Sequence, residues 1–108
     1  MNQAIARLLG PPTPRLLPWA TSEGKPAYLI SDGSGYLSRV ADNIESVQLG
    51  MADDLLDHAA DMLADHTSTP AQLRFLLARM RESLTDVRRI ADSRGERLAE
   101  PEWDEELL

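Results

Sequence analysis

From residue 37 onward, apolar side chains recur every three or four positions, the spacing of an amphipathic helix. The first stripe consists of Leu37, Ala41, Ile44, Gln48, Met51, Leu55, Ala59 and Met62, of which only Gln48 is polar. A second stripe consists of Leu73, Leu76, Leu77, Met80, Leu84, Val87, Ala91, Arg94 and Leu98. The pattern predicts two long helices, at about 37–65 and 70–98.

The residues between the two stripes predict a tight connection. Residues 66–69 interrupt the pattern, and Thr69, Pro70 and Gln72 then form a helix start with a capping box. If the helices run antiparallel, the numbers of facing residues add up to about 135, so the stripes match layer by layer and Met51 faces Leu84. We therefore expect a long antiparallel helical hairpin.

The segment before the first helix, residues 1–36, is rich in Pro and Gly. Two short apolar runs, 16–20 and 27–31, surround a polar loop with Gly24 and Pro26, a pattern typical of a β-hairpin. We expect a single, mainly α domain of 108 residues: this N-terminal segment, the helical hairpin at 37–98 and an acidic tail at 99–108.

The apolar surface of the two helices is wider than the seam of one hairpin. Val47, Leu56, Leu63, Phe75 and Ile90 all lie off the stripes. They need a further cover, which could be a second copy in a four-helix arrangement, another protein or the N-terminal segment. A homodimer is the favoured expectation.

Composition narrows the classes of function. The net charge of −7 opposes binding to nucleic acid, and the absence of cysteine excludes disulfides and thiolate metal sites. No stretch approaches the roughly 20 apolar residues of a membrane-spanning helix, so a cytoplasmic protein is expected. No serine lies in a nucleophile-elbow context and no cofactor motif is present. We expect a protein that is not an enzyme and needs no cofactor.

One cluster in the first helix could carry chemistry. Asp54, His58, Asp61 and Asp65 share one flank of the helix at one-turn spacing, as in metal sites of helical bundles. The alternative function is therefore a divalent-metal- or nucleotide-binding helical bundle, such as a hydrolase, that uses Asp54, His58 and Asp61. The favoured interpretation is a ribbon of ion pairs, in which Asp54 faces Arg81 and Asp61 faces Arg74.

The remaining candidates are partner-binding residues. Phe75 and Ile90 are apolar residues outside the second stripe, and Arg89 and Arg97 point away from the seam. In the tail, acidic residues surround Trp103 and precede Leu107 and Leu108, a combination suited to docking. The sequence thus favours a non-enzymatic interaction or regulatory protein that acts through helical surfaces and an acidic C-terminal tail.

Overall fold

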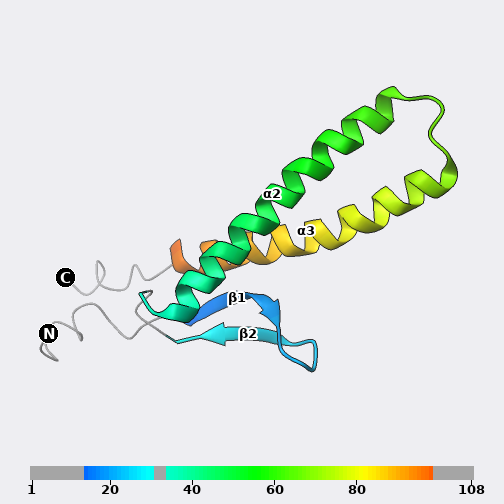
Figure 1. The fold of residues 1–108 in the computed structure, drawn as a ribbon. Helices are drawn as coiled ribbons and strands as arrows, with labels where there is room; N and C mark the ends of the chain where they lie inside the picture. Colours follow the sequence, from blue (N-terminus) through cyan, green and yellow to red (C-terminus); the bar gives the residue numbers. More distant parts are fainter. Residues whose placement is uncertain (1–13, 31–33, 99–108) are drawn as a thin grey trace, which may run out of the picture.

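The computed structural model describes residues 14–30 and 34–98. They form two short strands followed by two long helices: β1 (Arg15–Ala20), β2 (Pro26–Leu29), α2 (Tyr36–Ala64) and α3 (Pro70–Leu98). Figure 1 shows the two helices joined by a short turn, with the strands beside the opposite end of the hairpin. The predicted helical hairpin and the preceding β-hairpin are confirmed. The tail at 99–108 lies outside the described residues.

Local hydrogen bonds explain where the second helix begins. The Thr69 N–H donates to Gln72 Oε1 at 2.8 Å, and the Gln72 N–H donates to Thr69 Oγ1 at 3.1 Å. These reciprocal bonds are the predicted capping box. Just before it, Asp65 Oδ1 accepts bonds from the N–H and the hydroxyl of Thr67, at 2.8 and 2.6 Å. The turn between the helices is therefore held by its own side chains.

The two strands form an antiparallel sheet with one irregularity. Arg15 pairs with Leu29 and Leu16 with Tyr28, while the register shifts before Ala20 pairs with Pro26. Gly24 has a φ of +80° in the connecting loop, a conformation that favours glycine. Among the described residues the sheet has two strands, so one edge of β1 has none of them beside it.

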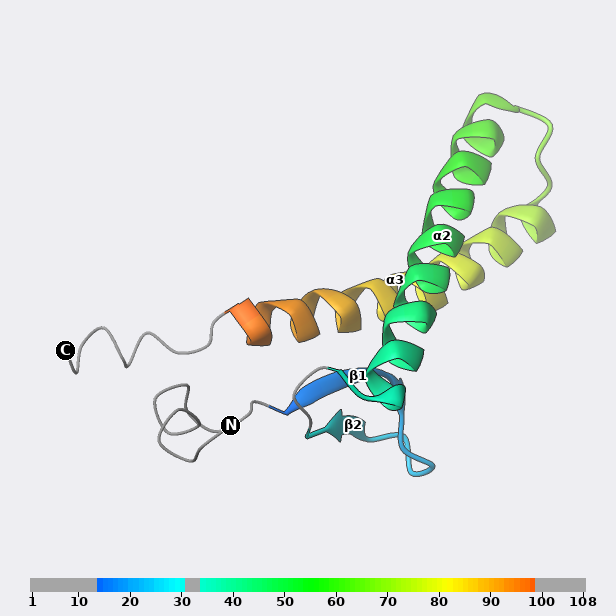
Figure 2. The same cartoon turned by 60° about the vertical axis from the view of Figure 1, so that its left-hand side comes forward.

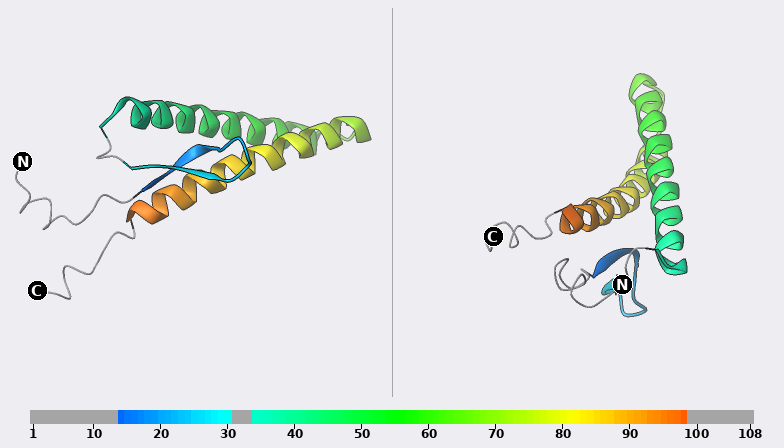
Figure 3. Two further views of the ribbon diagram at one scale, coloured as in Figure 1. Left: turned by 90° about the horizontal axis from the view of Figure 1, so that it is seen from below. Right: turned by 90° about the vertical axis from the view of Figure 1, so that its left-hand side faces the viewer.

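The two helices do not pack against each other along their whole length. Figure 2 shows α2 and α3 crossing, and in Figure 1 they are apart at the turn. At the opposite end β1 bonds to both helices, and the left view of Figure 3 shows it lying across the gap that separates them. The crossing leaves two openings, and among residues 14–30 and 34–98 a strand fills only the one away from the turn.

The core lies where β1 meets the two helices. It consists of Leu16, Leu17, Ala41, Leu76 and Ile90, together with the buried polar residues Arg15, Ser38, Glu45 and Ser93. Only Leu76 belongs to the half of the hairpin nearer the turn. The chain is thus packed at one end and open at the other.

The buried line on each helix is rotated from the predicted stripe. On α2 buried and half-buried positions run through Ser38, Ala41, Glu45, Gln48, Ala52, Leu55, Ala59 and Met62. On α3 they run through Leu76, Met80, Ser83, Val87, Ile90, Ser93 and Arg97. The expectation that Met51 is buried against Leu84 is wrong, since these side chains are 45% and 68% exposed. The pattern counted apolar side chains, whereas β1 recruits polar ones.

Two substitutions in α3 test this rotated line. Ile90→Ala should lower the free energy of unfolding by about 2–5 kcal/mol, because it removes a side chain that is only 3% exposed. Leu98→Ala should change it by less than about 0.5 kcal/mol, because Leu98 is 85% exposed although it belongs to the predicted stripe. Urea unfolding followed by circular dichroism measures both. A larger loss for Leu98→Ala than for Ile90→Ala would contradict the assignment.

Candidate functional site

A cluster of charges centred on the buried Arg15 and Glu45 holds β1 against the two helices. The Arg15 guanidinium donates to Asp42 Oδ1 at 2.7 Å and to the Ser38 carbonyl oxygen at 3.2 Å. It also lies 3.3 Å from Glu45 Oε2, while Arg94 Nη2 lies 3.7 Å from Glu45 Oε1. Glu45 is almost fully buried and bridges a cation from β1 to a cation from α3.

The open edge of β1 is satisfied by side chains from both helices. Ser93 Oγ donates to the Leu16 carbonyl at 2.8 Å, and Gln48 Nε2 donates to the Pro18 carbonyl at 3.1 Å. An unpaired strand edge otherwise invites pairing with another chain. β1 therefore serves as a wedge whose polar groups are matched within the chain, and we assign it a structural role.

Sequence reasoning missed this cluster. Arg15 stands directly before an apolar run, and Ser38, Glu45 and Ala52 follow a seven-residue spacing. Seven residues are almost two helical turns, so these positions share a face of α2. The single charged residue among them, Glu45, on a face otherwise made of small side chains was the signal available, but its partner in β1 is distant in sequence.

The residues predicted to bind a metal do not form a metal site in the part of the chain that the structure describes. Asp54, His58 and Asp61 are all exposed on α2. Asp65 follows the helix, and its bonds from the Thr67 hydroxyl and N–H hold the pKa of its carboxyl below the ordinary value. Within residues 14–30 and 34–98, no three His, Asp or Glu side chains are placed to hold a metal ion together.

The predicted ion pairs between the helices are also not formed. No ion pair joins Asp54 to Arg81 or Asp61 to Arg74 among the described residues. At about 100° of rotation per residue, the two aspartates leave the buried line of α2 on one side of the hairpin. The two arginines leave the buried line of α3 on the other side. Two residues at the same level along the hairpin can therefore lie on different sides of it.

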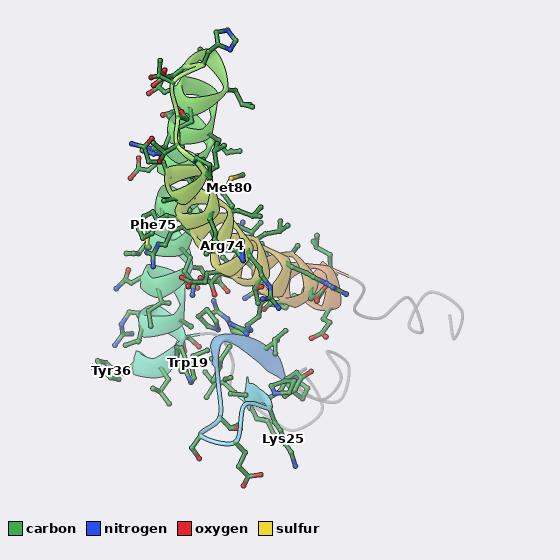
Figure 4. All side chains as sticks on the ribbon, turned by 90° about the vertical axis from the view of Figure 1, so that its right-hand side faces the viewer. Trp19, Lys25, Tyr36, Arg74, Phe75 and Met80 are labelled. Atoms are coloured by element: carbon green, nitrogen blue, oxygen red, sulfur yellow. The ribbon has the colours of Figure 1, made fainter. Side chains whose placement is uncertain are left out.

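The predicted partner-binding residues differ in how far the structure exposes them. Phe75 is exposed, as expected, and lies on the other side of α3 from Met80 (Figure 4). Ile90 is buried in the core, so its assignment to a free surface is wrong. Arg89 and Arg97 are half-buried, and Arg89 pairs with Asp86 at 3.6 Å. Trp103, Leu107 and Leu108 lie outside the described residues.

An apolar groove lies between the diverging helices. It has a volume of about 470 Å³ and is lined by Ala52, Leu55, Leu56, Leu77, Met80, Arg81, Ser83, Leu84 and Val87. Leu56, Leu77 and Leu84 are each more exposed than buried. Monomeric proteins rarely expose contiguous apolar surface of this kind, and where it occurs it usually marks an interaction site.

Opposite charges border the two long sides of the groove. Arg81 lines it on α3. On α2, Asp53 lies one turn before the lining residue Leu56 and is exposed. Asp53 and Arg81 stand at nearly the same level of the hairpin, but no ion pair between described residues joins them. Across its width the groove therefore runs from acidic through apolar to basic.

Comparisons with known proteins add no family: no protein-family model, no curated protein and no solved structure matches the chain. Among the described residues, neither α2 nor α3 combines the length and apolar character needed to cross a membrane. The functional argument therefore depends on the geometry of this chain alone.

Removing the Arg15 side chain tests the wedge. Arg15→Ala should lower the free energy of unfolding by about 3–5 kcal/mol, because it leaves the buried Glu45 with only a long contact to Arg94. Lys25→Ala is the matched control. Its 3.6 Å pair with Glu23 is exposed, and Lys25 projects away from the helices (Figure 4). The control should cost less than about 1 kcal/mol in urea unfolding. Similar losses for both variants would rule out a special role for Arg15.

Proposed function

We propose that this protein is a non-enzymatic interaction or regulatory protein that acts through its helical surfaces, and that it self-associates into a four-helix arrangement. The observation that carries the proposal is the apolar groove on the half of the hairpin nearer the turn. Its leucines stand in water in the isolated chain. Burying apolar surface stabilises association by roughly 25 cal/mol per Å².

The division of the fold supports this role. The wedge closes one end of the hairpin, and the buried Arg15–Glu45 cluster belongs to that end. The other end has long regular helices, a short turn held by its own hydrogen bonds and little core. Such a protein presents rigid helical surfaces to a partner without needing that partner to form its helices.

The acidic tail is part of the same proposal on the basis of its sequence. Residues 99–108 carry five acidic side chains, Trp103 and two terminal leucines. Charge would steer the tail to a basic partner, and the indole would anchor it. Partner proteins would therefore bind this chain through the tail, and not through a catalytic pocket.

Self-association has a direct test. Light scattering coupled to size-exclusion chromatography should give the mass of a dimer or a larger assembly at tens of micromolar. The physical reason is that a second copy removes the exposed leucines of both chains from water. A monomer mass across that concentration range would contradict this part of the proposal.

A truncation tests the assignment of the tail. Removal of residues 100–108 should leave the melting temperature unchanged, because the tail has no apolar periodicity to bury and its five acidic side chains repel one another. The truncated protein should at the same time lose binding to a basic partner protein captured by the full chain. A drop of several degrees on truncation, with blue-shifted Trp103 fluorescence in the full chain, would instead make the tail part of the fold.

A further inference from the structure

We infer that the groove is occupied by the groove of a second copy of this chain, with a two-fold axis running along the hairpin so that both turns lie at the same end. This inference rests on the proposed self-association and adds the face, the orientation and the charge pair that define it. The first step is the choice of face. The groove face carries Leu56, Leu77 and Leu84 around a hollow of about 470 Å³, whereas Phe75 lies on the other side of α3.

The described side chains of the wedge do not fill the hollow. The wedge is bound at the opposite end of the hairpin by Ser93 and Gln48, through the carbonyls of β1. Its buried residues are engaged there and cannot cover the groove at the same time. The described part of the chain therefore leaves the groove open to a separate molecule.

The next step is the charge across the groove. Arg81 borders the groove on α3, and Asp53 borders it on α2 at the same level. Asp57 stands one turn after Asp53 on α2 and is also exposed, whereas Asp54 and Asp61 leave the helix on the other side of the hairpin. The charges of the facing part of α3 are mainly basic, namely Arg74, Arg79, Arg81 and Glu82, with Arg79 and Glu82 already paired at 3.1 Å. A surface with an acidic side and a basic side is complementary to its own copy.

The charges also select the orientation of the second copy. If the two-fold axis ran across the hairpin, α2 of one copy would lie on α2 of the other, and the aspartates would repel each other. If the axis runs along the hairpin, α2 of each copy lies on α3 of the other. Arg81 of one protomer then meets Asp53 of its partner, and the pair occurs twice because the interface is isologous.

Charge exchange tests this geometry. Arg81→Asp alone and Asp53→Arg alone should each shift the dimer to monomer, because each places like charges opposite one another at both pairs. An equimolar mixture of the two variants should recover a heterodimer. One of its protomers has Asp at positions 53 and 81 and the other has Arg at both, so each of the two pairs joins opposite charges. Light scattering gives the mass, and native mass spectrometry separates the heterodimer from homodimers. Circular dichroism should show unchanged helicity, because both side chains are exposed or line the groove.

A pair of apolar variants tests the face independently. Leu77 and Phe75 are both 70% exposed and stand two residues apart on α3, but only Leu77 lines the groove. Leu77→Asp should lower the dimer fraction at least tenfold at fixed concentration, while Phe75→Asp should leave it unchanged. A wild-type dimer that dissociates on Phe75→Asp, or that is indifferent to both charge variants, would overturn the inferred geometry but not self-association. A monomeric wild-type protein would overturn the self-association itself.

Discussion

The buried contact between Arg15 and Glu45 is the interaction on which the rest of this structure depends. It joins the first described strand to the first half of α2, and Glu45 also faces Arg94 near the end of α3. A carboxylate inside a protein is costly unless it is paired. Here two cations from separate elements supply that pairing, so three segments distant in the sequence must meet at one place. The helices can close on each other at that end only around β1.

This constraint explains why the hairpin is unevenly packed. With a strand between them at one end, two straight helices cannot remain in contact along their whole length. They cross and separate again toward the turn, where the apolar groove opens (Figures 1 and 2). The wedge that stabilises one half thus exposes the leucines of the other half. The insertion of β1 thus explains both the core at one end of the hairpin and the exposed groove, which is the proposed interaction surface.

The position of charges relative to the groove separates two kinds of electrostatic interaction in this chain. Arg15 and Glu45 act at short range in a buried pair, where the absence of one partner leaves the other unpaired, and the exposed Asp42 also binds Arg15. Asp53 and Arg81 stand at the rim, in water, where charge contributes to orientation and partner choice more than to stability. Asp54 and Asp61 belong to the exposed surface of α2 and pair with no side chain of α3 among the described residues.

The sequence by itself determined the elements: the two helices, the capping box at Thr69 and Gln72, and the short strands around Gly24 all follow from local spacing and turn chemistry. It also indicated that the apolar surface exceeds one hairpin. It did not determine which side of each helix is buried, because Ser38, Glu45 and Ser93 are polar and an apolar pattern passes over them. Only the tertiary structure placed Ile90 in the core and left Met51 and Leu84 in water. The reason is that Arg15 and the open edge of β1 need polar partners, and those partners rotate both helices away from their most apolar stripes.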